Sequence, residues 1–188
     1  DDGSADGTYE ELLFWERHYP NIIKTYRMPR DTSKEYEPIV RVSNNRISLL
    51  KNAKGKYITF LDGDDYYLAK DALVKLVDVL EKNEDVSLVH GGYQSFNDKT
   101  GLTIHTFTKW DSPMAHTHGK DSVYALLCED YSYYPLGSSS CFRREVYLEG
   151  CKKYEDLITV KDTSGEGTIL NVTMGMAGKI AFIPNLIT

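Results

Sequence analysis

Three carboxylates follow directly on a short apolar segment of the chain. Asp62, Asp64 and Asp65 come after residues 57–61, which read Tyr-Ile-Thr-Phe-Leu. Because an unpaired buried carboxylate is costly, we expect these acids at the mouth of a crevice, facing a cation or hydrogen-bond donors. An Asp-x-Asp there suits Mg²⁺ or Mn²⁺, hard cations that prefer oxygen ligands and are shared with substrate phosphates. The spacing therefore indicates a metal- and nucleotide-dependent transferase.

A second acidic segment opens the chain, where residues 1–8 read Asp-Asp-Gly-Ser-Ala-Asp-Gly-Thr. Residues 2–7 match the first half of a calcium-binding EF-hand loop, but the twelfth position counted from Asp2, which must supply a bidentate Glu, is Leu13. An aspartyl-phosphate phosphohydrolase also carries Asp-x-Asp after a strand. That class needs Thr or Val soon after the second Asp, where this chain has Asp65-Tyr66. Both alternatives are therefore disfavoured.

The pattern of apolar residues predicts the elements that position these acids. We expect helices over residues 8–19, 43–52 and 69–82, with strands over residues 22–26, 57–61 and 86–90. Alternating strands and helices predict a mostly parallel sheet with helical cover, and ligands bind such sheets at the carboxyl ends of the strands. Further on we expect a turn at residues 98–101 and strands over residues 102–109 and 180–183. We expect helices over residues 122–129, 144–149 and 168–177.

Size and composition exclude some classes of function. The chain has 188 residues, enough for one domain with a substantial core, and a net charge of -6. That charge argues against nucleic-acid binding, which needs a basic surface. The three cysteines indicate no disulfide framework and favour a reducing compartment, with each thiol a small buried apolar group. We find neither a signal peptide nor an apolar run of membrane-spanning length.

Four motifs occur in order along the chain: Asp-Asp-Gly-Ser-Ala-Asp-Gly-Thr at residues 1–8, the acidic segment at residues 54–65, Leu-Gly-Ser-Ser-Ser-Cys-Phe-Arg-Arg-Glu at residues 136–145, and Gly-Lys-Ile-Ala-Phe-Ile-Pro at residues 178–184. Together they resemble inverting family 2 glycosyltransferases of the GT-A fold. Residues 1–8 are similar to that family's DDGSxDGT loop, and residues 54–65 to its GEYIxFLDSDD segment. Residues 136–145 are similar to its GSSxxFRRE stretch, and residues 178–184 to its GKIxYIP strand. The resemblance covers essentially the whole chain.

The resemblance implies an α/β GT-A domain over residues 1–188, with a Rossmann-like, mostly parallel sheet flanked by helices. Residues 1–92 would form the nucleotide-sugar-binding half and residues 93–188 an acceptor-binding half. The family's first strand or strands would lie upstream of residue 1 and are absent from this chain.

The same resemblance assigns roles to individual residues. Asp2 would accept a hydrogen bond from the base of the nucleotide-sugar; the alternative is an aspartate that forms the turn and caps the next helix. For Asp1 and Asp6 we expect a structural role of this kind in the loop. Asp64 would be the direct ligand of Mn²⁺ or Mg²⁺, while Asp62 would bind the donor ribose or reach the metal through water. Arg46 would contact the diphosphate or base, although its motif departs from the family at Ile47 and Leu49. A solvated arginine at a helix end is the alternative.

The catalytic base is the largest departure from the family pattern. The family has a Glu-Asp pair about a dozen residues before the GKI strand, whereas this chain has Glu166-Gly167. We therefore assign the base to Glu166, with Asp162 or Asp156 as the alternatives.

The implied function is transfer of a hexosyl or N-acetylhexosaminyl group from a nucleotide-diphospho-sugar, with a UDP-sugar favoured, to a saccharide or lipid-linked acceptor. The implied context is bacterial cell-envelope polysaccharide biosynthesis in the cytoplasm, with peripheral association at the inner face of the membrane. The alternative is a GT-A domain that binds nucleotide or a partner but is catalytically impaired. The sequence does not identify the donor sugar, the linkage or the oligomeric state.

Overall fold

The computed structural model describes residues 1–28, 38–108, 116–128, 137–153 and 166–188. The chain separates into two units, Asp1–Lys54 and Gly55–Thr188. The expected division into two halves near residue 92 stays a prediction.

The first unit consists of two helices and the segments around them. Helix α1 spans Thr8–His18 and helix α2 spans Pro38–Asn52, so the first matches its expected range and the second begins five residues earlier. The prediction of a strand over residues 22–26 is wrong, because the structure has no strand at these residues. Instead, Tyr26 accepts a hydrogen bond from the amine of Asp1, and Met28 donates one to the carbonyl of Asp1. These two bonds pair the segment with a single residue, which is too short for a ladder.

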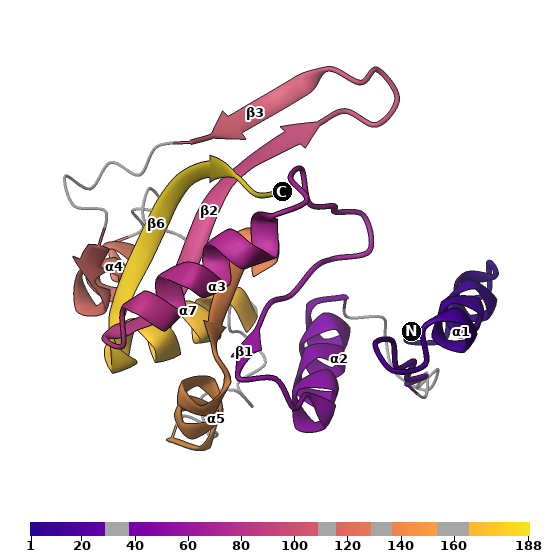
Figure 1. Ribbon diagram of the computed structural model, residues 1–188, viewed down its shortest axis with the longest axis horizontal. Helices are drawn as coiled ribbons and strands as arrows, with labels where there is room; N and C mark the ends of the chain where they lie inside the picture. The colour runs from indigo at the N-terminus through magenta and orange to yellow at the C-terminus, as the bar shows by residue number, and fades with distance from the viewer. Residues whose placement is uncertain (29–37, 109–115, 129–136, 154–165) are drawn as a thin grey trace. The chain divides into compact units, whose positions relative to one another are not determined.

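A mixed sheet forms the centre of the second unit (Figure 1). Its strands in the described residues are β1 (Tyr57–Ile58), β2 (Val86–Phe96), β3 (Thr103–Phe107), β4 (His116–His118), β5 (Ser140–Arg143) and β6 (Lys179–Leu186). The order is β1-β5-β2-β6-β4, and β3 forms a hairpin with β2.

The sheet is partly parallel. Strands β2 and β6 pair in parallel, while β5 runs antiparallel to both β1 and β2. Strands β1, β2 and β6 therefore all point in one direction, as expected for an α/β nucleotide-binding sheet. The antiparallel strand β5, which sequence patterning did not predict, lies between β1 and β2.

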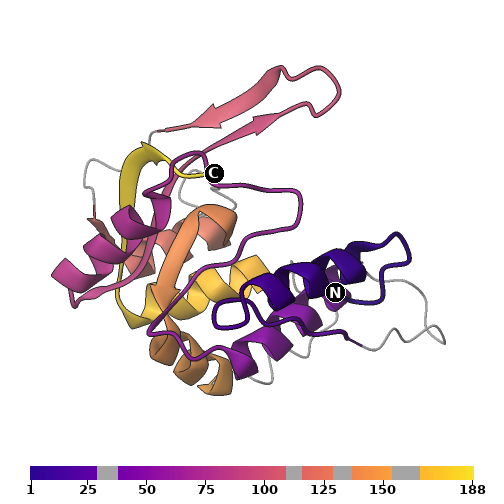
Figure 2. The same ribbon diagram turned by 45° about the vertical axis from the view of Figure 1, so that its right-hand side comes forward.

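Helices cover both faces of this sheet (Figure 2). Helix α3 (Ala72–Lys82) packs on one face, where its buried side chains join Val86, Val89, Cys141, Ala181 and Ile187 in the core. Helix α7 (Glu166–Ala177) packs on the other face, where the hydroxyl of Ser87 donates to the carbonyl of Met174 at 2.7 Å. The α/β class with helices flanking a sheet is thus confirmed.

Two further helices fix the position of α7. Helix α4 (Gly119–Leu127) approaches it so closely that a Cβ built on Gly119 would lie 2.2 Å from the carbonyl oxygen of Gly175. On α5 (Arg144–Lys153), a Cβ on Gly150 would lie 1.8 Å from the Thr173 side chain. Only glycine fits at these crossings. Helix α7, with Glu166 at its first turn, is therefore held between two neighbours.

Buried polar groups also belong to this core. His90 is 1% exposed, and its ring lies 5.0 Å from that of Phe182 between ring centroids. Burial lowers the pKa of His90 to about 3, so its imidazole is neutral at neutral pH. Burial raises the pKa of the Cys141 thiol to about 12, which confirms Cys141 as an apolar core residue. Cys128 is exposed, so the expectation of burial is wrong for it.

Arg143, in the segment similar to FRRE, has a structural role. Its Nη2 atom donates to the carbonyls of Leu80 at 2.6 Å and Asn83 at 3.0 Å, and its Nε donates to the carbonyl of Val86 at 2.8 Å. Carbonyls at the end of a helix have no partner within the helix. Arg143 satisfies those at the end of α3 and links this helix to β5 and the start of β2.

Replacing Arg143 with Met should therefore lower the free energy of unfolding by about 3 kcal/mol, because charge-assisted hydrogen bonds to three carbonyls are lost. Urea denaturation measures this change. The matched control is Lys82→Met in the last turn of the same helix, where the exposed lysine pairs with Asp78. We expect that change to cost no more than about 1 kcal/mol. Equal losses for the two variants would contradict the capping role.

Candidate functional site

The acidic segment forms an exposed loop after β1. The strand ends at Ile58, three residues before the expected end, and the side chains of Asp62, Asp64 and Asp65 are all exposed. The amide of Asp65 donates to the carbonyl of Asp62 at 3.0 Å, which makes a tight turn. All three acidic residues thus lie on the surface of the second unit.

Hydrogen bonds hold this loop at the carboxyl ends of the strands. The hydroxyls of Thr59 and Tyr67 are 3.1 Å apart and close the loop at its base. Just beyond, the amide of Leu68 donates to the carbonyl of Ile187, which follows β6. Ile187 in turn donates to the carbonyl of Gly92 in β2. The loop therefore lies beside the ends of β2 and β6, at the edge where open α/β sheets bind ligands.

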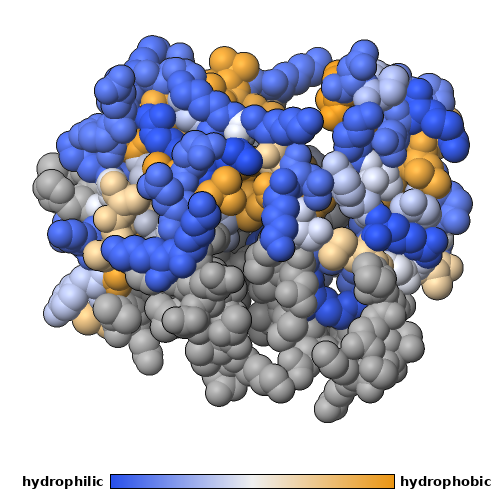
Figure 3. All heavy atoms as spheres, turned by 90° about the horizontal axis from the view of Figure 1, so that it is seen from below, coloured by the Kyte–Doolittle hydropathy of each residue, from blue (hydrophilic) through white to orange (hydrophobic). Residues whose placement is uncertain are grey.

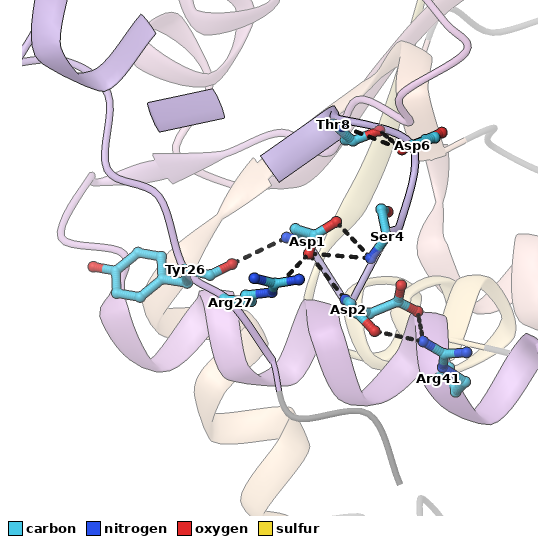
Figure 4. Close-up of polar contacts among 9 residues, drawn as sticks. Asp1, Asp2, Ser4, Asp6, Thr8, Tyr26, Arg27 and Arg41 are labelled. Carbon is cyan, nitrogen blue, oxygen red and sulfur yellow. Dashed lines mark hydrogen bonds and ion pairs between the residues drawn. The ribbon is translucent and has the colours of Figure 1, made fainter. Parts of the chain in front are cut away.

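The opening loop is organised by Asp1 (Figure 4). The side chain of Asp1 is 1% exposed and accepts hydrogen bonds from the amides of Gly3 and Ser4, with Arg27 Nε at 3.6 Å from its Oδ2. The Asp1 carboxylate is thus buried and bonded to other groups of the loop, which is consistent with the structural role expected for Asp1. Asp6, which precedes the N-cap residue Gly7 of α1, accepts from the amide and hydroxyl of Thr8 at 3.2 and 2.6 Å, a local contact within the loop.

Asp2 has a different environment from Asp1. Its side chain is 30% exposed, and its Oδ2 lies 2.5 Å from Nη2 of Arg41. The same nitrogen donates to the main-chain carbonyl of Asp2 at 2.7 Å. Arg41 lies on α2 and was not singled out from the sequence, because no residue spacing connects it to a loop 39 positions upstream.

Arg46 also lies on α2 and is half-buried. Five positions along a helix correspond to a rotation of about 140° around its axis, so Arg41 and Arg46 point from different faces. The contact to Asp2 comes from Arg41. The role expected for Arg46, at the diphosphate or base, stays a prediction.

Glu166 is the first residue of α7. The alternatives Asp156 and Asp162 lie outside the described residues. Glu166, Asp62 and Asp64 belong to the second unit, while Asp2 and Arg46 belong to the first.

The acidic loop offers oxygen ligands, the kind that Mg²⁺ and Mn²⁺ prefer. In the part of the chain that the structure describes, no group of three or more His, Cys, Asp or Glu residues is arranged to hold a metal ion. Mg²⁺ is commonly held by one or two carboxylates together with substrate phosphates. The exposed Asp62 and Asp64 therefore fit an ion whose coordination a bound diphosphate completes.

Comparison with known protein families supplies the deciding observation. The model of a family described as "Glycosyl transferase family 2" matches residues 1–147, which include the opening loop, the acidic loop and β5. The chain belongs to glycosyltransferase family 2. A search of curated proteins found no match. Membership of family 2 supports a glycosyltransferase that takes a nucleotide-sugar donor and a separate acceptor.

Two observations bear on the surface of this family 2 glycosyltransferase. None of the helices in the described ranges is long and apolar enough to cross a membrane. On the face shown in Figure 3, hydrophilic side chains predominate and apolar ones occur in small separate groups. Scattered apolar residues are normal on protein surfaces, so we infer no partner from them.

Proposed function

We propose that this family 2 glycosyltransferase is inverting and depends on Mn²⁺ or Mg²⁺. Its donor is a UDP-sugar carrying a hexosyl or N-acetylhexosaminyl group, and its acceptor is a saccharide or lipid-linked saccharide. The reaction serves assembly of a bacterial surface polysaccharide on the cytoplasmic side of the membrane. The observation that carries the proposal is the exposed acidic loop at the carboxyl ends of β1 and its parallel neighbours, within a chain of this family.

In this proposal each acidic residue has a separate task. Asp64 holds the metal ion, and Asp62 contacts the donor ribose or the metal through water. The bound ion supplies charge stabilisation for the departing nucleoside diphosphate. Asp2 accepts a hydrogen bond from the imide N–H of uracil, a match of acceptor to donor. Arg46 supplies a charged donor to the diphosphate or the base.

Glu166 completes the reaction as general base. It takes the proton of the acceptor hydroxyl while that oxygen forms a bond to the sugar carbon. The bond from this carbon to the diphosphate oxygen breaks, and the nucleoside diphosphate leaves with the electron pair. Attack opposite to the leaving group inverts the configuration at the sugar carbon.

Isothermal titration of nucleoside diphosphates tests the proposal at its first step. We expect uridine diphosphate to bind in the presence of Mn²⁺ and much more weakly in EDTA. A panel of UDP-hexoses and UDP-N-acetylhexosamines, assayed for release of the diphosphate, then separates an active enzyme from an impaired binding domain. Absence of nucleotide binding with and without Mn²⁺ would contradict the proposal.

A further inference from the structure

A single nitrogen of Arg41 contacts both the main-chain carbonyl and the side-chain carboxylate of Asp2. Nη2 carries two N–H groups and contacts the main-chain oxygen of Asp2 at 2.7 Å and its Oδ2 at 2.5 Å (Figure 4). The two side chains are 22% and 30% exposed, so the pair is only partly screened by water. An aspartate in a loop normally turns about two side-chain bonds, and this double contact removes that freedom.

The loop around Asp2 is already rigid. Its neighbour Asp1 is fixed by the amides of Gly3 and Ser4. The amine and carbonyl of Asp1 are paired with Tyr26 and Met28. The backbone of the loop therefore has its own support, and the contact that Arg41 adds acts on the Asp2 side chain.

We infer that Arg41 is a positioning residue that fixes the Asp2 carboxylate and thereby sets which nucleobase the enzyme accepts. The inference rests on the proposed base-binding role of Asp2. In the described part of the chain, Oδ2 is occupied by Arg41, while no hydrogen bond from protein to Oδ1 is present. Oδ1 is therefore the oxygen presented to a base.

A fixed carboxylate oxygen distinguishes bases by their hydrogen-bonding pattern. Uracil and thymine have an N–H at ring position 3, whereas cytosine has an acceptor nitrogen there and an amino group beside it. A carboxylate held in one orientation repels the acceptor nitrogen of cytosine. A carboxylate that turns freely reaches the amino group instead and accepts both bases. Arg41 should therefore control the ratio of the two affinities more than the affinity itself.

The experiment measures the dissociation constants of uridine and cytidine diphosphate by titration calorimetry with Mn²⁺. The proteins are the wild type, Arg41→Met, Arg41→Lys and the control Lys51→Met, an exposed lysine on the same helix. We expect Arg41→Met to reduce the preference for uridine over cytidine by about tenfold, the effect of losing one orienting contact. Arg41→Lys should retain part of the preference, because an ammonium reaches one of the two oxygens. Lys51→Met should match the wild type.

Different outcomes separate this inference from the proposed function. Wild-type protein that binds neither nucleotide contradicts the proposed function. Wild-type protein that prefers uridine, together with an unchanged ratio in Arg41→Met, overturns only the inference and leaves Arg41 as a structural link between the loop and α2. Circular dichroism checks folding. If Arg41→Met does not fold, Arg41→Lys decides, since an unchanged ratio in that variant also overturns the inference.

Discussion

Replacing Asp64 with asparagine is expected to abolish Mn²⁺-dependent binding of uridine diphosphate. The amide keeps the shape of the side chain but removes the charge that attracts a hard cation. Asp64 is exposed in the loop after β1, so the substitution removes no core contact and the variant should fold as the wild type does. Titration calorimetry with and without Mn²⁺ measures the effect directly.

The neighbouring acids provide matched controls for that experiment. Asp62→Asn should weaken metal-dependent binding less than Asp64→Asn, because Asp62 reaches the ribose or acts through water. Asp65→Asn, one position further along the same exposed loop, should have the smallest effect. Unchanged Mn²⁺-dependent affinity in Asp64→Asn would show that the metal ligand is elsewhere.

The second large effect is expected for Glu166→Gln, which should lower turnover by about 10²–10⁴-fold. Glutamine has the same size as glutamate but cannot accept the proton of the acceptor hydroxyl. Affinity for the nucleotide should remain unchanged, since a base acting on the acceptor does not contact the donor. Initial rates of diphosphate release with acceptor present, together with calorimetry, separate these two quantities.

Glu149→Gln is the matched control for this variant, because Glu149 is exposed on the adjacent helix α5. It should retain wild-type turnover. Full activity of Glu166→Gln would rule out Glu166 as the base and transfer the assignment to Asp162 or Asp156. Those two residues would then be replaced one at a time by asparagine.

Helices with a strong apolar stripe could be predicted closely from the sequence. Leu76 and Leu80 lie one turn apart and are fully buried in α3, which ends at Lys82 as expected and begins three residues later. The strand that begins at Val86 was also predicted, although it continues to Phe96. Local periodicity determines such elements because one buried face suffices to define them.

The strand β5 shows where local patterns were insufficient. It begins with Ser140, and the preceding Ser138 and Ser139 are at most 2% exposed. Short runs of serine are typical of loops, so nothing in the segment predicted a central strand. The place of β5 in the sheet is set by its pairing with β1 on one side and β2 on the other. Both partners are distant in the sequence, so a local pattern does not reveal the pairing. The same pairing makes the sheet only partly parallel.

One part of the candidate site could be predicted from the sequence and another part could not. The acids at residues 62–65 follow a recognisable strand, and their position at the sheet edge agrees with the expected one. Arg41 was not predictable, because its importance comes from a contact with Asp2 made through the fold. Sequence patterns therefore indicated the acidic loop but not the arginine that contacts Asp2.

The place of β5 has a consequence for synthesis of the protein on the ribosome. Strand β1, which precedes the acidic loop, pairs with β5, and Lys56 accepts a hydrogen bond from Arg144. A nascent chain that has reached only residue 100 thus contains all the acids of the loop but not the strand that fixes them. The loop becomes ordered only after residue 144 has left the exit tunnel. Until then β1 lacks its partner strand, so the fold around the acidic loop is completed by a segment far downstream in the sequence.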